Sequence, residues 1–323
     1  MTTVSPNIIT IILNWNGKND TLHCLRSFPS GSEVIVVDNG SSDGSVAAIR
    51  AEFPTVTVLE TGENLGFAGG NNVGIEYALK QGADWIFLLN NDTVVDPHIF
   101  EAFRKTASKQ PEVGIWGAKI YLFDKPNQFD HFGGNWNPRT ANFDLIGYRA
   151  VEDGKSWEKP VKMDYACGAA LFIKKDVFEK IGLLEPRYFL FWEESDFCFR
   201  VAKAGFATFL CPGAKVRHKV SASCPGKAHT YYFWWRNRLL WIERNCSREE
   251  KRRLFFRVLL PELFKLRRHL LVKGLQLKLL SLFIDKTKLS ERIKKHQRYR
   301  ASWQGVKDYY GRRFGNAPPS IFK

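Results

Sequence analysis

Residues 33–45 read EVIVVDNGSSDGS, and this stretch decides the fold class. Residues 34–37 are all apolar and β-branched, which is typical of a strand that is buried on both faces. Asp, Asn, Gly and Ser follow directly, and these residues favour turns and helix caps. A buried strand that ends in a polar turn and leads into a helix is the repeating step of a parallel α/β sheet.

The same step recurs on both sides of this stretch. Further on, from residue 113 to about 220, short apolar runs predict mixed strands and loops, with helices near 174–181 and 194–204. We therefore predict an α/β fold with a mostly parallel central sheet flanked by helices. The expected strands are 7–14, 33–38, 55–60 and 85–90, and the expected helices are 21–28, 44–52, 70–81 and 97–110.

Polar clusters follow the expected strands. They are Asn14-Trp15-Asn16, residues 38–43, the segment NLGFAGGNN at 64–72, and Asn90-Asn91-Asp92. Ligands of open α/β sheets bind beyond the carboxyl ends of the strands, so all four clusters should line one edge. The glycines at 66, 69 and 70 do not have the spacing of a dinucleotide-binding fingerprint.

Two aspartates in these clusters are candidates for nucleotide chemistry. The carboxylate of Asp38 could accept hydrogen bonds from a base edge or a ribose, and that of Asp92 could hold a hard divalent cation beside a diphosphate. For each residue, a plain role as a turn or helix-capping acid stays open.

Residues 192–196, Trp-Glu-Glu-Ser-Asp, place three acids among aromatic residues. A carboxylate here could act as the general base for an acceptor hydroxyl. The alternative is that these acids stabilise a helix N-terminus, and we expect this supporting or structural role for Glu193 and Asp196. His218 follows an expected strand at 215–217, where a structural role is also open.

Charge is distributed unevenly along the 323 residues. The net charge is +15, and residues 248–313 contain 20 Lys/Arg against 6 Asp/Glu, whereas the rest of the chain has 28 against 27. The six cysteines are scattered without a close pair, which argues against a zinc knuckle or a disulfide framework and favours reduced thiols in the cytoplasm. The apolar run at 8–13 is too short for a signal peptide or a membrane span.

The order of these motifs closely resembles family 2 glycosyltransferases, in particular a rhamnosyltransferase-like branch, over about residues 6–245. The resemblance implies a GT-A fold. Residues 1–245 would form the catalytic domain, with a nucleotide-sugar half at 1–112 and an acceptor half at 113–245. Residues 246–323 would form a basic amphipathic helical tail.

The resemblance also implies roles for single residues. Glu194 matches the catalytic base, and Asp92 matches the last acid of the family's Asp-x-Asp motif, which binds Mn²⁺ or Mg²⁺. His218 matches a histidine that reaches the metal or the diphosphate. Nucleotide-sugar binding would use Trp15 against the base, Asp38 at the base edge, Asn91 at the ribose, Asn64 and Asn72 around the pocket, and Arg236 at the diphosphate; for Arg236 a structural role is equally open.

This sequence departs from the family pattern at two positions. Asn90 stands where the first acid of Asp-x-Asp is expected, so Asp92 is the motif's only carboxylate. Glu193-Glu194 stands where many relatives have Glu-Asp, so the acceptor hydroxyl would sit differently. The implied reaction is inverting transfer from a nucleoside-diphosphate sugar, with rhamnose as a family-level guess, to a glycan or lipid-linked acceptor of cell-surface polysaccharide or lipopolysaccharide.

The basic tail leaves several partners open. A basic helix with Leu and Phe on one side could bind an anionic membrane surface through residues 248–313, which would suit a peripheral enzyme on the inner face of the plasma membrane. A packed appendage and a homodimer interface are alternatives. A nucleic-acid-binding protein is a further alternative. No recognised nucleic-acid motif supports it, and we expect no nucleic acid among the partners. Nucleotidyl transfer also stays open, although residues 66–70 lack the basic residue that a triphosphate site often uses.

Overall fold

The computed structural model describes residues 6–219, 227–284 and 289–321. Their contacts divide the chain into two compact units. The first contains residues 1–135, 144–186 and 193–221, and the second contains residues 136–143, 187–192 and 222–323. Helix α7 (Ala228–Asn245) therefore belongs to the second unit, because it packs along α10 (Ser290–Tyr310).

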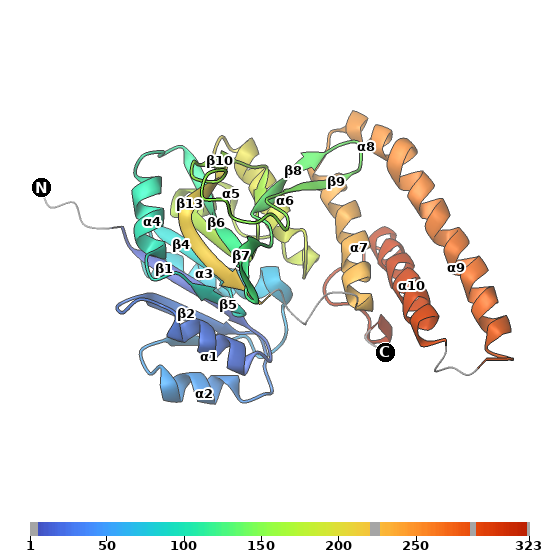
Figure 1. Cartoon of the computed structure of the whole chain (residues 1–323), viewed down its shortest axis with the longest axis horizontal. Coiled ribbons are helices and arrows are strands. Elements are labelled where there is room, and N and C mark those ends of the chain that lie inside the picture. The colour runs from blue at the N-terminus through green and yellow to red at the C-terminus, as the bar shows by residue number, and fades with distance from the viewer. Residues whose placement is uncertain (1–5, 220–226, 285–288, 322–323) are drawn as a thin grey trace, which may run out of the picture. The chain divides into compact units, whose positions relative to one another are not determined.

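The first unit is built on one long mixed sheet (Figure 1). The parallel half has the order β4-β1-β2-β3, and β12 joins it antiparallel to β4. The N-terminal α/β prediction is confirmed, including the mixed strands that follow it. The strands of this sheet are β1 (Ile8–Asn14), β2 (Glu33–Asp38), β3 (Thr57–Glu60), β4 (Trp85–Asn90), β5 (Thr93–Val95), β6 (Val113–Leu122), β7 (Lys125–Phe129), β10 (Val161–Lys162), β12 (Ala170–Lys174) and β13 (Ala207–His218).

Helices cover both faces of the sheet because successive strand side chains point to opposite sides. In β1, Ile12 belongs to a buried cluster with Cys24 of α1 and Ile49 of α2. Ile11 faces the other way, toward Gly74 of α3. The helices are α1 (Lys18–Arg26), α2 (Ser45–Glu52), α3 (Gly66–Lys80), α4 (Ile99–Ala107), α5 (Lys175–Ile181) and α6 (Glu193–Lys203).

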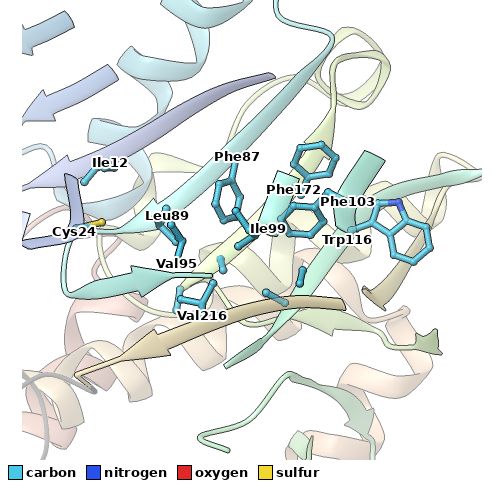
Figure 2. Packing of buried hydrophobic residues seen from close by; sticks show 14 of the residues in the cluster. Ile12, Cys24, Phe87, Leu89, Val95, Ile99, Phe103, Trp116, Phe172 and Val216 are labelled. Carbon is cyan, nitrogen blue, oxygen red and sulfur yellow. The ribbon is translucent and has the colours of Figure 1, made fainter. Parts of the chain in front are cut away.

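The core beside α4 is aromatic (Figure 2). Phe103 of α4 stacks on Phe172 of β12 with ring centroids 4.3 Å apart, and Phe87 of β4 meets Phe103 edge-on. Trp116 of β6 is fully buried in the same cluster. This packing fixes β4 and β12 side by side; β4 ends at the polar edge described below, and the antiparallel β12 begins there.

Smaller elements complete the first part of the chain. A second sheet has the order β11-β8-β9, formed by β11 (Tyr165–Ala166), β8 (Gly133–Asn137) and β9 (Asn142–Ile146). A 3₁₀ turn, η1 (Pro186–Tyr188), precedes α6. The five described cysteines are buried, and Cys224 lies outside the described residues.

The second unit is helical. It contains α7, α8 (Arg248–Leu254), a π-helical turn η2 (Phe255–Leu259), α9 (Leu260–Leu280), α10 and η3 (Pro319–Ile321). Tyr232 and Phe233 of α7 are buried together with Ala301 of α10. The Tyr232 hydroxyl donates to Asp308 Oδ2 at 2.8 Å. Among the described residues, no helix is long and apolar enough to span a bilayer.

Candidate active site

The polar ends of β1, β2 and β4 meet at one edge of the sheet. Asn14 lies opposite Asp38 in the β1–β2 ladder, and its Nδ2 donates to Asp38 Oδ1 at 2.8 Å. Thr21 Oγ1 donates to Asn14 Oδ1 at 2.7 Å, and Asn91 Nδ2 donates to Thr21 Oγ1 at 3.0 Å. This chain of hydrogen bonds confirms that the polar clusters at these strand ends share one edge.

Asp38 holds the loop after β2 in shape. It is only 3% exposed, and its Oδ2 accepts a hydrogen bond from the Ser41 backbone N–H at 2.9 Å. Ser41 Oγ in turn accepts from the Asn16 N–H at 2.9 Å. Trp15, next to Asn16, is 55% exposed, so its ring is open to a ligand at this edge. Asp38 thus organises the site around Trp15, and its contact with a base edge stays a prediction.

The glycine-rich segment has a different structure from the one expected. The sequence predicts that the helix begins at residue 70, after a glycine-rich loop, whereas α3 already begins at Gly66. Asn64 stabilises the start of the helix, because its Oδ1 accepts from the Gly66 N–H at 2.9 Å and from Asn39 Nδ2 at 3.1 Å. A Cβ on Gly74 would lie 2.6 Å from Ile11 Cγ2, so small residues on α3 serve close helix–sheet packing.

Asn72 lies on α3, where it makes a reciprocal pair of hydrogen bonds with the backbone of Leu184. Its Nδ2 donates to Leu184 O at 2.9 Å, and its Oδ1 accepts from Leu184 N at 3.1 Å. The side chain therefore ties α3 to the segment that follows α5. Shaping the nucleotide pocket remains the predicted role of Asn64 and Asn72.

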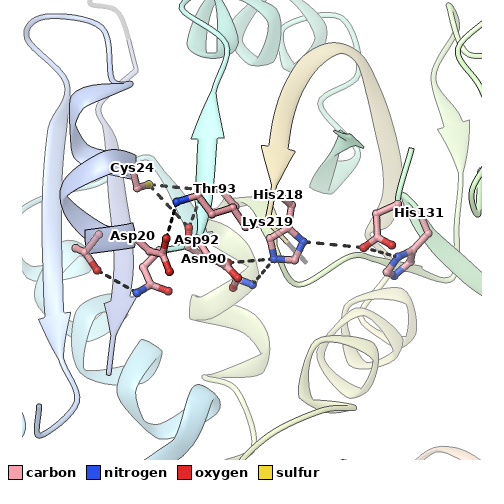
Figure 3. Close-up of polar contacts among 11 residues, drawn as sticks. Asp20, Cys24, Asn90, Asp92, Thr93, His131, His218 and Lys219 are labelled. Carbon is pink, nitrogen blue, oxygen red and sulfur yellow. Dashed lines mark hydrogen bonds and ion pairs between the residues drawn. The ribbon is translucent and has the colours of Figure 1, made fainter. Parts of the chain in front are cut away.

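Asp92 and His218 face each other across a short strand pair (Figure 3). The chain turns after Asp92 into β5, and Thr93 lies opposite His218 in the antiparallel β5–β13 ladder. His218 Nε2 is 3.1 Å from Asp92 Oδ1, and their side chains are 11% and 12% exposed. Asn90 Nδ2 lies 3.5 Å from the same imidazole nitrogen. Residues 126 positions apart thus form one polar pair.

Asp130 and His131, which the sequence did not single out, stand behind His218. Asp130 Oδ2 lies 4.0 Å from His218 Nδ1 and 3.4 Å from His131 Nδ1. Burial alone would raise the pKa of Asp130, but the hydrogen bond and charge of His131 and the charge of Arg149 outweigh it, so that pKa is lowered. No local sequence signal could have found this pair, because Asp130 meets His218 only through the pairing of distant strands.

The Asp92–His218 pair suits a divalent cation in its chemistry. A carboxylate oxygen and an imidazole nitrogen are ligands that Mn²⁺ accepts, and diphosphate oxygens or water can complete its shell. Lys219, which follows His218, is neutralised by Asp20, whose Oδ1 lies 2.5 Å from its Nζ. Among the described residues there is no group of three or more His, Cys, Asp or Glu that could hold a metal ion. A metal bound here would therefore depend on oxygens of the donor.

Glu194 lies in the first turn of α6, beside the segment 167–169. A Cβ on Gly168 would lie 3.5 Å from Glu194 Cγ, at ordinary van der Waals distance, so this side chain lies directly beside Gly168. The neighbouring Ala169 carbonyl accepts from the Asn90 N–H at 3.0 Å. Burial and the charge of Glu194 raise the pKa of Tyr165 well above its usual value. Glu194 thus lies beside Gly168, whose neighbour Ala169 is hydrogen-bonded to Asn90 at the end of β4.

The other acids of this helix are buried. Asp196 is fully buried, and its Oδ2 accepts from Arg200 Nε at 3.0 Å. The Arg200 guanidinium also donates to the Ile181 and Leu183 carbonyls. Glu193 is 4% exposed. These contacts agree with a structural role for Asp196 and suit the same role for Glu193.

In the second unit, Arg236 and Asn237 hold the segment that leads into α6. Arg236 is fully buried and donates to the carbonyls of Gly315 and Tyr188 at 2.6 and 2.8 Å, contacts that favour the structural alternative for this residue. Asn237 Nδ2 lies 2.7–2.8 Å from the carbonyl oxygens of residues 188, 190 and 191.

The segment held by Asn237 has strained backbone. Phe189, Phe191 and Trp192 have φ values of 64°, 67° and 77°, which cost bulky residues about 1–3 kcal/mol each. Such conformations persist only where surrounding contacts fix them, as the Asn237 amide does here. The strained segment ends at Trp192, directly before Glu193, the first residue of α6.

Comparisons with known proteins agree with this geometry. Residues 10–182 match the protein family described as "Glycosyl transferase family 2". The chain is 30% identical to N-acetylglucosaminyl-diphospho-decaprenol L-rhamnosyltransferase of Mycobacterium tuberculosis, over 65% of this chain and 79% of that protein. It is 27% identical to the low-salt glycan biosynthesis hexosyltransferase Agl10 of Haloferax volcanii, over 74% of this chain and 76% of that protein. It is 22% identical to the dTDP-rhamnosyl transferase RfbF of Shigella flexneri, over 67% of this chain and 70% of that protein.

Two solved structures share the fold at 14% identity. One is a mannosyltransferase of Pyrobaculum calidifontis in complex with GDP-Man and Mn²⁺, with a TM-score of 0.52 over 95% of this chain and 88% of that one. The other is GalNAc-T7 with UDP, GalNAc and Mn²⁺, with a TM-score of 0.54 over 74% of this chain and 48% of that one. Both are similar to this chain in the arrangement of the α/β sheet and its helices.

Proposed function

Because the chain belongs to glycosyltransferase family 2 and has the GT-A fold, we propose that it moves a sugar, with rhamnose the first candidate, from a nucleoside diphosphate to a glycan or lipid-linked acceptor. The observation that carries this proposal is the Asp92–His218 pair at the carboxyl edge of the sheet, with Glu194 beside Gly168, next to the residue bonded to the same strand end. Family membership decides against the nucleotidyltransferase and nucleic-acid alternatives.

The proposed roles follow from the placement of the side chains. Trp15 would stack on the base, while Asp38 and Asn91 would bind base edge and ribose at the ends of β2 and β4. Asp92 and His218 would hold Mn²⁺ or Mg²⁺, which when bound supplies positive charge beside the diphosphate leaving group. Arg236 would act at a distance, by holding the segment before α6.

In the proposed reaction Glu194 takes the proton from an acceptor hydroxyl. The oxygen forms a bond to the anomeric carbon from the side opposite the diphosphate, and the bond from that carbon to the phosphate oxygen breaks. The electron pair leaves with the nucleoside diphosphate. One displacement inverts the anomeric configuration.

A donor screen tests this function. Nucleoside diphosphates and their sugars are added with Mn²⁺ or Mg²⁺, and the melting temperature is recorded. At a hundredfold excess over Kd, we expect the preferred nucleotide to raise the melting temperature by about 5 °C, and transfer to release nucleoside diphosphate. Release of pyrophosphate, or no response to any nucleotide, would contradict the proposal.

We further propose that the enzyme binds an anionic membrane surface through the outer face of the helical run from α8 to α9. Phe264, Leu271 and Leu275 on this face are 70%, 66% and 61% exposed. Residues 252–283 contain eight Lys/Arg and a single acid, Glu262. Exposed apolar side chains among cations are complementary to anionic lipid. The enzyme would then be peripheral, bound at the inner face of the plasma membrane.

A paired substitution tests the membrane proposal. In Leu271→Ser/Leu275→Ser we expect affinity for phosphatidylglycerol vesicles to fall roughly thirty-fold, because two leucines no longer enter the interface. Leu145→Ser, which changes an exposed leucine of β9, should bind as the parent does. Vesicle flotation measures both. If the parent chain binds no vesicles but forms a dimer, and the paired substitution dissociates that dimer, this face is a homodimer interface instead.

A further inference from the structure

Two adjoining cavities lie among α7, α9 and α10 within the second unit. Their volumes are about 650 and 620 Å³, within the range of sites for small organic ligands. Both are lined by His269 of α9 and by Lys295 and Tyr299 of α10, and the His269 and Tyr299 rings stack at 5.0 Å. Because they share these three lining residues, the two cavities adjoin, and together they are called here the α9–α10 groove.

The two ends of the α9–α10 groove differ in chemistry. At one end Tyr231, Trp234 and Trp235 of α7 line it with aromatic rings. At the other end Leu277 and Leu280 of α9 line it with aliphatic side chains. A ligand that fills the whole groove must therefore be long and largely apolar.

Cations line both cavities of the groove. Lys265 of α9 lines the aromatic cavity, Lys273 of α9 and Arg292 of α10 line the aliphatic one, and Lys295 of α10 lines both. Within the described part of the chain none of these four forms an ion pair with a carboxylate. The acid Glu262 at the aromatic end is held by Arg238 at 2.5 Å. Burial and the charges of neighbouring Arg and Lys side chains, Lys265, Lys273 and Lys295 among them, lower the pKa of His269. This field attracts a multivalent anion.

We propose that the α9–α10 groove binds the diphosphate and the first isoprene units of a polyisoprenoid carrier on which the acceptor glycan is built. The proposal rests on the proposed function, in which the acceptor is lipid-linked. The lysines would bind the diphosphate, and the leucine end would take the hydrocarbon chain. The opposite face of the same helix carries the apolar stripe assigned above to the membrane, so the chain could enter the groove from the lipid phase.

Farnesyl diphosphate, a short carrier analogue, tests the groove with the full-length protein. Trp234 and Trp235 line the site, so quenching of tryptophan fluorescence reports binding. We expect farnesol, inorganic diphosphate and dihexanoyl phosphatidylglycerol each to bind at least about ten-fold more weakly than farnesyl diphosphate, because each lacks one part of the ligand. Equal binding of any of these three would overturn the assignment to an isoprenoid diphosphate.

Matched variants locate the site. Lys265→Gln/Lys295→Gln should raise the Kd for farnesyl diphosphate roughly ten-fold or more, because two charge-assisted contacts are lost. Lys294→Gln, which changes the neighbouring lysine that pairs with Glu291, should leave it unchanged. Leu277→Asn should weaken binding, whereas Leu275→Asn on the exposed face should not.

The outcomes separate this proposal from the proposed function. Unchanged affinity in Lys265→Gln/Lys295→Gln would overturn the groove assignment, even where the nucleotide screen succeeds. Intact binding of farnesyl diphosphate together with no response to any nucleotide would instead overturn the donor site. Of the five positions changed in these variants, Leu277 is partly buried and the other four are exposed. Melting temperatures equal to the parent's verify that the variants are folded.

Discussion

Glu194→Gln should reduce kcat for sugar transfer by roughly 10²–10⁴-fold, because glutamine cannot accept the proton of the acceptor hydroxyl. The amide has nearly the same shape as the carboxylate, so the packing beside Gly168 is kept. Affinity for the nucleoside-diphosphate donor should stay within about two-fold of the parent value, since the loss falls on the transition state rather than on donor binding. Single-turnover transfer and nucleotide titration measure the two quantities separately.

A matched control for this variant is Glu179→Gln, at an exposed glutamate of the neighbouring helix α5. It should transfer sugar at the parent rate. Full activity of Glu194→Gln would remove Glu194 from the role of general base. A loss of donor affinity equal to the loss in rate would mean that the substitution disturbs the site as a whole.

Asp92→Asn should lower kcat/KM by roughly three orders of magnitude, equivalent to about 4 kcal/mol of transition-state stabilisation. The expected cause is loss of the only carboxylate that the Asn90-Asn91-Asp92 segment offers a cation. The backbone contact is unaffected, because the Lys219 N–H donates to the Asp92 main-chain carbonyl at 2.9 Å. The melting temperature without ligands should therefore change little, whereas the metal-dependent rise on adding nucleotide should disappear.

Asp96→Asn is the control for Asp92, because Asp96 follows β5 and caps the turn into α4 through the His98 N–H. It should keep its response to metal and nucleotide. Excess EDTA should stop turnover by the parent enzyme, and added Mn²⁺ should restore it. Unchanged turnover in EDTA, or a parent-like metal response in Asp92→Asn, would contradict the assignment of the cation to this pair.

Much of the fold and part of the site could be predicted from local sequence. Residues 33–38 and 85–90 are apolar runs that end in polar residues, and both are strands of the sheet as predicted. The glycine-rich segment shows where such prediction fails. The sequence predicts that the helix begins at residue 70, but Gly66 and Gly69 already belong to α3, because glycines also allow a helix to pack closely on a strand.

Other features depended on contacts between distant segments. The contacts of Arg236 could not be predicted, because its acceptors are carbonyls almost 50 and 80 residues away. The same holds for Asp130, which meets His218 only because β6, β7 and β13 belong to one sheet. An Asp-His dipeptide alone carries no such information.

The sequence by itself determined the α/β class, the edge at which the polar strand ends gather and the family, since strand periodicity and the order of motifs are local properties. Tertiary structure alone decided that Asp92 faces His218, that Glu194 lies beside Gly168 next to the residue bonded to the end of β4, and that the basic tail has both an exposed apolar face and a groove between its helices. The physical reason is that these pairings depend on strand register and helix packing, which chain segments far apart in sequence establish only when they fold together.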